Sequence, residues 1–223
     1  MTMCDASGRA DLPPSLGPAT LTRSSQTDRL AVMPNASSAR RLLAPAVLLV
    51  FGVAYSAAQW SMQPGQSKLT FVATQAGAKF EGAFEQFSAD IHFDPDDPGA
   101  GRFDVVIDLN SVNSRDRERD EVIAGPDMLD AAQWPTARYV VQGFTAIGGG
   151  KYRGAGRLTL RNVTRETPIE FTFKRDGDVA WLVGGARLKR LDFGVGQGEW
   201  RDTEWVGDEV EVRFSLKLAG AGR

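Results

Sequence analysis

The stretch that decides the fold is the last patterned segment of the chain, Asp208-Glu-Val-Glu-Val-Arg-Phe-Ser-Leu-Lys-Leu218. From Glu209 onward, polar and apolar side chains alternate, and the apolar members are Val210, Val212, Phe214, Leu216 and Leu218. Because successive side chains of a strand point to opposite faces, the alternation predicts one strand with an apolar face and a polar face. Its ten residues exceed the usual strand length of about five or six.

The same period of two recurs along most of the chain that precedes this segment. Further strands are predicted at residues 68–73, 78–87, 89–94, 102–109, 136–147, 152–160, 167–175 and 179–189. Turn signals separate them, among them Pro95–Gly99, Gly148–Gly150 and Asp176-Gly177-Asp178. Even spacing predicts an antiparallel sandwich or barrel, and the strand lengths favour a barrel, which leaves no open sheet edge. We therefore expect an all-β fold, an antiparallel barrel of about eight strands with an interior wide enough for side chains or one small ligand.

One segment breaks the pattern. Residues 113–124 are charged and contain helix formers, they begin with two N-cap candidates, Asn113 and Ser114, and Gly125-Pro126 follows them. This predicts one short helix in a long connection, with a second helical turn at Met128–Ala132 before Trp134-Pro135. Asn162–Thr164 is expected to be a turn, and residues 192–205, rich in glycine and tryptophan, an irregular connection.

The first 58 residues are expected to lie outside the fold. Residues 1–39 show no hydrophobic period, whereas Arg40-Arg41 precede the apolar run Leu42–Ala57, which ends in small residues. This order is typical of a signal peptide, predicted at about residues 33–58 with cleavage near Ala58, and Met33 is an alternative start. An uncleaved membrane anchor is the other interpretation, although a run of 16 residues is short of the roughly 20 that span a bilayer. We expect a disordered leader and signal peptide in 1–58, a barrel domain in 59–223, and a periplasmic location.

Composition argues against several classes of function. The 223 residues carry a net charge of −2, which provides no electrostatic footprint for nucleic acid. The one cysteine, Cys4, lies in the predicted leader, and the one histidine, His92, lies on the polar face of its strand. Thiolate or histidine metal sites and histidine-dependent triads are therefore not expected. With no catalytic constellation, the pattern indicates a container rather than an enzyme.

From Trp60 to Leu218 the sequence resembles the YceI-like family of exported lipid-binding proteins. The ordered motifs are Gly82-Ala-Phe84, Phe87, Ile91-His-Phe93-Asp94, Ser111-Val112, Arg119-Asp120, Met128-Leu129-Asp130, Trp134-Pro135, Gly156-x-Leu158-Thr159-Leu160, Val163-Thr164 and Asp192-Phe193-Gly194. Asn162 stands where the family usually has glycine. The resemblance implies a lipocalin-like barrel whose buried tunnel holds a long apolar molecule such as a polyisoprenoid, an isoprenoid quinone or a fatty amide.

Two groups of residues are candidates for the site that the resemblance implies. The candidate tunnel lining is Phe71, Phe84, Phe93, Phe103, Ile107, Leu109, Phe171, Phe173, Val212 and Phe214, and the alternative is that these side chains only pack a core. Arg119 and Asp120 are candidates for the tunnel mouth, where an arginine could hold a headgroup, and the alternative is a solvated helix face with weak ion pairs. No metal ligand and no cofactor other than a bound lipid are expected.

The function expected from these features is that of an exported carrier or sequestering protein for a long-chain isoprenoid, quinone or related amphiphile. Some relatives are fused to or encoded with membrane cytochrome b modules, so a fully packed barrel that serves as an interaction module for a membrane redox partner is an alternative. An enzyme acting on a bound lipid is a second alternative, and a homodimer is left open.

Overall fold

The computed structural model describes residues 58–220. Apart from Ala58, the predicted leader and signal peptide, with Met33 and Cys4, lie outside the described residues. Within 58–220 there is one α-helix, α1 (Arg117–Ala124), and short 3-10 turns occupy Pro64–Gln66, Pro98–Ala100, Leu109–Ser111, Arg190–Phe193 and Gly198–Arg201. The strands are β1 (Gln59–Met62), β2 (Lys68–Gln75), β3 (Ala78–Phe84), β4 (Phe87–His92), β5 (Arg102–Asp108), β6 (Val112–Asn113), β7 (Thr136–Gln142), β8 (Thr145–Gly148), β9 (Lys151–Leu160), β10 (Val163–Asp176), β11 (Val179–Lys189) and β12 (Glu209–Gly220).

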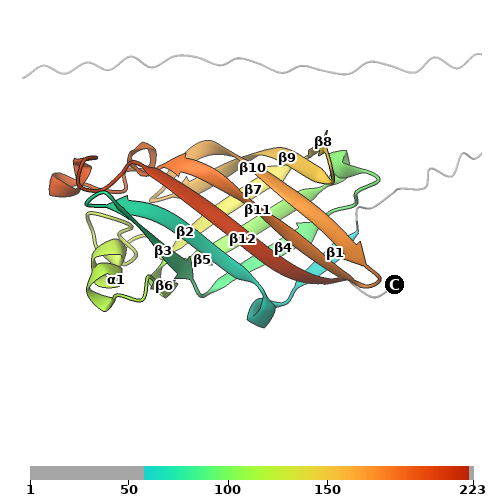
Figure 1. Ribbon diagram of the computed structural model, residues 1–223, viewed down its shortest axis with the longest axis horizontal. Helices are drawn as coiled ribbons and strands as arrows, with labels where there is room; N and C mark the ends of the chain where they lie inside the picture. The colour runs from blue at the N-terminus through green and yellow to red at the C-terminus, as the bar shows by residue number, and fades with distance from the viewer. Residues whose placement is uncertain (1–57, 221–223) are drawn as a thin grey trace, which may run out of the picture. The chain divides into compact units, whose positions relative to one another are not determined.

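The strands of residues 58–220 close into an antiparallel barrel (Figure 1). Eight of them form the ring β1-β4-β5-β7-β9-β10-β11-β12, and β12 returns to β1 with Leu218 opposite Met62. β12 pairs with β1 near its C-terminal end and with β2 further along the same edge. β4 pairs with β1, and β3 pairs with β2. β1 and β2 therefore act as one interrupted strand of the barrel, and β3 and β4 act as another. The prediction of an eight-stranded antiparallel barrel with one short helix is confirmed.

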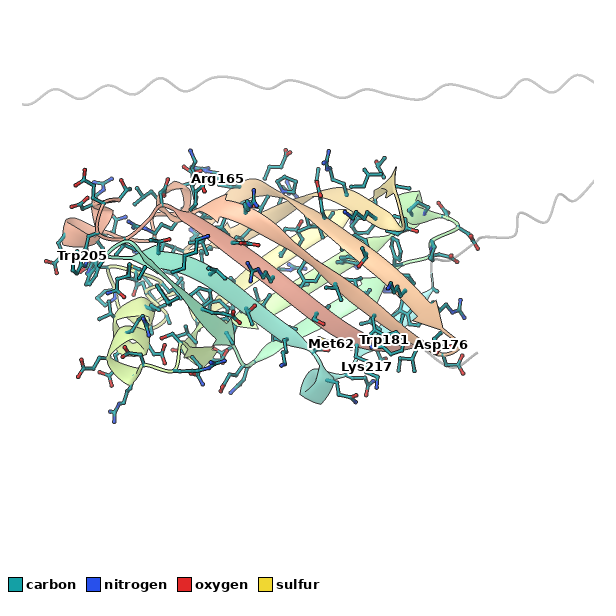
Figure 2. All side chains as sticks on the ribbon, in the orientation of Figure 1. Met62, Arg165, Asp176, Trp181, Trp205 and Lys217 are labelled. Atoms are coloured by element: carbon teal, nitrogen blue, oxygen red, sulfur yellow. The ribbon has the colours of Figure 1, made fainter. Side chains whose placement is uncertain are left out.

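The long hairpin strands follow the predicted alternation closely. β11 has the predicted bounds, and its inward residues Ala180 and Leu182 are buried while Trp181 and Val183 face outward. Trp181 lies opposite Lys217 of β12 on the outer surface, and Trp205 lies towards the other end of the barrel (Figure 2). The two faces of each strand therefore separate an apolar interior from a mixed, charged exterior.

Two predicted strand boundaries are wrong for reasons of backbone geometry. The single strand expected at 136–147 breaks at Gly143, which has φ +75°, and the Phe144 amide donates to the carbonyl of Pro98 instead of a ladder partner. The turn expected at Asn162–Thr164 lies instead at Arg161-Asn162, because these two residues take φ +48° and +60° and Val163 already pairs with Leu160.

The helical connection also differs from the expectation. Arg115, with φ +63°, keeps the chain out of helix until the Asp116 carboxylate caps α1 by accepting from the Arg119 amide at 3.2 Å. The second helical turn expected at Met128–Ala132 is a series of tight turns, in which Asp130 has φ +50°. Non-glycine residues at positive φ cannot continue a right-handed helix, which is why α1 is shorter than the charged segment.

Candidate functional site

The barrel encloses a cavity of about 210 Å³ whose lining is almost wholly apolar. Side chains from β2, β3, β4, β5, β7, β9, β10, β11, β12 and α1 contribute to it. Among its lining side chains, only Tyr139, Thr167 and Arg190 carry a polar group. The interior therefore offers a hydrocarbon surface to whatever enters it.

The inward face of β12 shows where the filled part of the interior ends and the hollow part begins. Leu218 and Leu216 are 0% and 5% exposed, as expected for a packed core. Val210, Val212 and Phe214 point to the same side of the strand and line the cavity, yet each remains partly exposed. Interiors of proteins are normally close-packed, so partly uncovered inward side chains mark unfilled space.

Two of the three polar groups of the lining, those of Tyr139 and Arg190, are engaged within the protein. The Tyr139 hydroxyl donates to the carbonyl oxygen of Thr167 at 2.9 Å, and burial raises the pKa of this phenol above its usual value. The Arg190 guanidinium donates to three carbonyl oxygens, those of Gly207 (3.0 Å), Val195 (3.0 Å) and Val206 (2.6 Å). Burial lowers the pKa of Arg190, and the nearby Asp208 carboxylate opposes that shift. Among the described residues, every buried side-chain nitrogen or oxygen has a hydrogen-bond partner.

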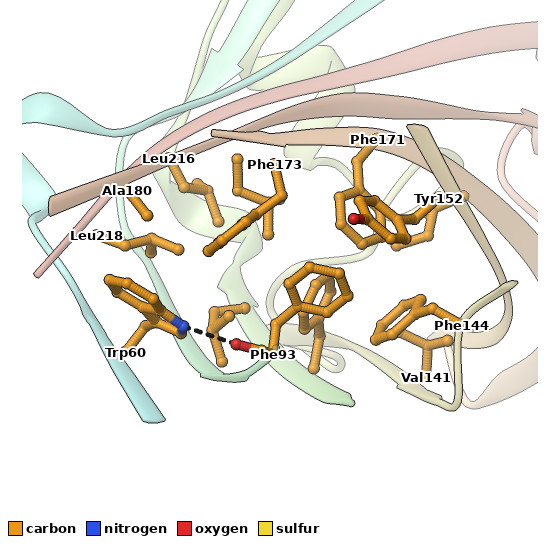
Figure 3. Close-up of a cluster of buried hydrophobic side chains, with 14 residues drawn as sticks. Trp60, Phe93, Val141, Phe144, Tyr152, Phe171, Phe173, Ala180, Leu216 and Leu218 are labelled. Carbon is orange, nitrogen blue, oxygen red and sulfur yellow. Dashed lines mark hydrogen bonds between the residues drawn. The ribbon is translucent and has the colours of Figure 1, made fainter. Parts of the chain in front are cut away.

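A close-packed group of rings, here called the aromatic plug, fills one part of the barrel (Figure 3). The plug consists of Trp60, Phe93, Phe103, Phe144, Tyr152, Phe171 and Phe173. Phe93 is fully buried at its centre, and the Trp60 indole donates to the Phe93 carbonyl oxygen at 2.9 Å. The plug closes the cavity on this side, because Phe103 belongs to the plug and also lines the cavity.

Two loops, the β6–β7 connection that contains α1 and the β11–β12 connection, cover the cavity at the end of the barrel where α1 lies (Figure 1). Their buried apolar side chains are Ile123, Met128, Leu129, Val195 and Val206, each no more than 9% exposed. The loops are tied together, because the amides of Gly196 and Gln197 donate to the Asp127 carbonyl oxygen at 2.8 and 2.7 Å. This end of the cavity is therefore covered by apolar side chains rather than open to solvent.

The side wall is interrupted where β3 passes into β4. There the Glu85 and Gln86 amides leave the ladder and donate to Ser111, to its carbonyl oxygen and hydroxyl respectively, each at 3.0 Å. An outer recess at this place is lined by Leu69, Phe84 and Phe87, which also line the cavity. At this break the cavity and the exterior are separated by single side chains.

The structure divides the candidate tunnel residues into two groups. Phe71, Phe84, Phe103, Ile107, Leu109, Val212 and Phe214 line the cavity. Phe93, Phe171 and Phe173 are outside the cavity lining and pack within the plug. The period of two places all ten side chains on inward faces, but it carries no information about which level of the barrel is filled.

The two candidate mouth residues lie on α1 and do not belong to the cavity lining. Arg119 donates from Nε to the Ser114 hydroxyl at 2.9 Å, and its guanidinium lies over the ring of Phe80. The Asp120 carboxylate accepts from the Ser114 amide at 2.8 Å. Both residues therefore fix α1 to the connection before it, and Arg119 alone also contacts the wall, through Phe80, which lines the cavity.

The sequence analysis missed several lining residues. Leu158 and Leu160 follow the alternation of β9 and could have been found by it. Arg190, Val195 and Val206 come from an irregular segment without any period, so no local signal identifies them.

Between residues 58 and 220 there is no cluster of three or more histidine, cysteine or carboxylate side chains arranged to hold a metal ion. No helix in this range is long and apolar enough to cross a membrane.

Comparison with known proteins identifies the fold family. The family model of the YceI-like domain matches residues 60–218. The chain belongs to the YceI-like family. A UPF0312 protein of Vibrio campbellii is 30% identical to this YceI-like chain over 160 residues, which cover 69% of the chain and 85% of that protein.

Solved structures agree with this assignment. BcnA from Burkholderia cenocepacia is 34% identical to the YceI-like chain, with a TM-score of 0.68, and the match covers 70% of this chain and 99% of BcnA. A polyisoprenoid binding domain from Saccharophagus degradans is 19% identical, with a TM-score of 0.58, and covers 73% of this chain and 99% of that domain. At 19% identity the second likeness shows the shared fold.

Proposed function

We propose that this YceI-like protein is an exported carrier or sequestering protein that binds a long-chain isoprenoid, an isoprenoid quinone or a related amphiphilic lipid inside the barrel. The observation that carries the proposal is the hollow apolar interior: inward side chains such as Val212 and Phe214 line a cavity and remain partly uncovered. An apolar chain in the cavity would cover them. Support also comes from a structural neighbour with the same fold, which is described as a polyisoprenoid binding domain.

The chemistry of the lining favours an apolar chain over a polar ligand. Tyr139 and Arg190 already donate to backbone carbonyl groups, so the lining offers a polar ligand little beyond the Thr167 hydroxyl. Burial of each methylene contributes about 0.8 kcal/mol, and a long hydrocarbon can therefore bind tightly without a polar anchor. The cost of ordering the ligand and the protein reduces this gain but does not change its sign for a long chain.

The cavity also bears on the alternatives. A fully packed barrel serving a membrane redox partner would not need a hollow half, so the interaction module is the weaker proposal. An enzyme acting on a bound lipid would need a polar pair aimed at the ligand, and two of the three polar side chains of the described cavity lining, Tyr139 and Arg190, are engaged with backbone carbonyls. A periplasmic location fits a lipid carrier, since it would let the protein receive its cargo from a membrane, and it rests on the signal peptide proposed for residues 33–58.

Native mass spectrometry of the protein purified from its own host tests the proposal. We expect a tightly held apolar adduct that disappears on denaturation and reappears in the organic extract. Phe214→Trp should lower its occupancy, because the larger ring enters space that the lipid would fill. Val183→Trp is the matched control, since Val183 lies on the outward face of β11 and is 47% exposed. A protein that carries no apolar adduct and takes up none from lipid vesicles would contradict the carrier function.

A further inference from the structure

The two halves of the barrel interior differ sharply in packing. In the plug, Phe93 is 0% exposed and is surrounded by five rings. Their centroids lie 4.8 Å (Tyr152), 4.9 Å (Phe173), 5.3 Å (Phe171), 5.6 Å (Phe144) and 6.1 Å (Phe103) from that of Phe93. These separations are the usual contact distances of aromatic rings, so the plug leaves no passage for a hydrocarbon chain (Figure 3).

The plug is fitted to the wall as well as to itself. A β-carbon at Gly154 would lie 2.6 Å from Cδ1 of Phe144 and 2.7 Å from Cγ2 of Val141. A β-carbon at Gly184 would overlap the carbonyl oxygen of Glu170 and lie 2.6 Å from Cβ of Phe171. Real side chains do not approach so closely, so the absence of a side chain admits the Phe144 ring at Gly154 and the backbone of β10 at Gly184. The Phe144 ring of the plug is therefore packed directly against the wall.

A small set of side chains forms the boundary between the plug and the cavity. Ile91, Phe103, Ile169, Leu182 and Leu216 belong to the packed cluster and also line the cavity. Phe103 is the aromatic member, 2% exposed, with its ring centroid 4.5 Å from that of Phe144 and 5.2 Å from that of Phe171. These five side chains, here called the floor of the cavity, are the surface at which the cavity ends against the plug.

We infer that the aromatic plug, through Phe103, sets the maximum length of the apolar chain that the cavity accepts. The inference rests on the proposed function and adds that the protein selects its cargo by tail length. Each methylene that enters the cavity should raise affinity by up to about four-fold, because it leaves water for an apolar surface. A methylene beyond the floor has no room inside and contributes little.

Selection by the tail follows from the chemistry of the lining. Tyr139 and Arg190 hold backbone carbonyls, so the described lining offers little more than the Thr167 hydroxyl with which to discriminate headgroups within the cavity. Length and width of the chain are then the features that the interior can recognise. Amphiphiles with different heads but equal tails should compete on nearly equal terms.

The test is a binding series of all-trans prenyl alcohols that differ by one isoprene unit, measured by competition in native mass spectrometry. For the natural sequence, affinity should rise with each unit and then level off at one length. Phe103→Ala should move that length upward by at least one unit. Trp181→Ala is the matched control, because Trp181 lies on the outward face of β11 and is 40% exposed, and it should leave the length unchanged. If Phe103→Ala does not fold, Phe103→Leu and Leu182→Ala, which also lower the floor, make the same test.

The outcomes separate this inference from the proposed function. Prenyl alcohols that bind with no limiting length, or with the same limit in every floor variant, would overturn the role of the plug and leave the carrier function standing. Failure of every prenyl alcohol to bind would overturn both. An upward shift in the floor variants alone supports the plug as the determinant of chain length.

Discussion

The guanidinium carbon of Arg119 lies 4.5 Å from the centre of the Phe80 ring, and Phe80 lines the cavity. A cation over an aromatic face contributes about 0.5–1 kcal/mol at a partly exposed site. Arg119 also donates to the hydroxyl of Ser114, which is 5% exposed. One side chain thus joins α1, the connection before it and the cavity wall.

Replacement of Arg119 should loosen this contact and speed ligand exchange. Arg119→Met keeps much of the apolar stem but removes the charge and the donors, so we expect a stability loss of about 1 kcal/mol and a few-fold faster release of a bound prenyl alcohol. Stopped-flow displacement measures the rate. Arg117→Met is the control, because the Arg117 side chain is 92% exposed and pairs with Glu121 on the same helix. Equal rates in the two variants would show that the contact does not hold the wall.

Loss of the Arg190 side chain should destabilise the barrel strongly. Arg190→Met leaves the carbonyl oxygens of Val195, Val206 and Gly207 without their donors in a buried setting. We expect a decrease in the free energy of unfolding of about 3 kcal/mol or more, measured by urea denaturation. Arg187→Met, at an exposed position of the preceding strand, should cost far less. A small effect of Arg190→Met would mean that water replaces the lost donors.

Stability should fall in acid, partly because of Asp104. Its carboxylate accepts from Arg138 at 2.8 and 2.7 Å and from Arg102 at 2.7 Å, and the hydrogen bond from Arg138 is the main reason that its pKa lies below the usual value. The folded state then binds this proton less readily than the unfolded state, so the stabilisation is present at neutral pH and is lost as pH falls below about 4.

The variant Asp104→Asn isolates this contribution. Its free energy of unfolding should be lower than that of the natural sequence at neutral pH. This difference should shrink as the pH falls to about 3, below the usual pKa of an aspartate. Urea titrations over this range measure it. Glu118→Gln, an exposed carboxylate on α1, should show no comparable pH-dependent difference. A difference for Asp104→Asn that is constant with pH would exclude an electrostatic origin.

A methyl group at Gly156 should disturb the cavity wall. A β-carbon there would overlap the phenol of Tyr139, which would have to give up its bond to Thr167. We expect Gly156→Ala to lower stability by about 1–3 kcal/mol, because overpacking forces side chains from their preferred positions. Thermal unfolding measures the loss, and Gly65→Ala, which meets no atom within 4 Å, is the control. Equal melting temperatures for the two variants would contradict the overlap.

Phe71 and Phe171 show how far local pattern predicts the site. Each is an inward aromatic residue in an alternating strand, and the sequence offers no means to tell them apart. Phe71 lines the cavity. The Phe171 ring packs in the plug, where its centroid lies within 5.5 Å of the ring centroids of Phe93, Phe103, Phe144 and Tyr152. Their difference comes from the strands that face them, which are remote in the chain.

The sequence by itself determined most of the strands and their two faces, because side-chain direction in a strand depends only on position along the chain. The strand lengths favoured a barrel, and its closure is seen in the tertiary structure, where β12 pairs with β1. It also determined that residues 209–218 present Val210, Val212, Phe214, Leu216 and Leu218 to the interior. Only the tertiary structure decided that Leu216 and Leu218 are covered and that Val210, Val212 and Phe214 remain partly exposed. The reason is physical: whether an inward side chain is covered depends on the residues that other strands and loops bring to the same level of the barrel. Which residues meet at each level depends on residues with positive φ, on glycines in the wall and on an irregular loop. None of these features follows the period of two.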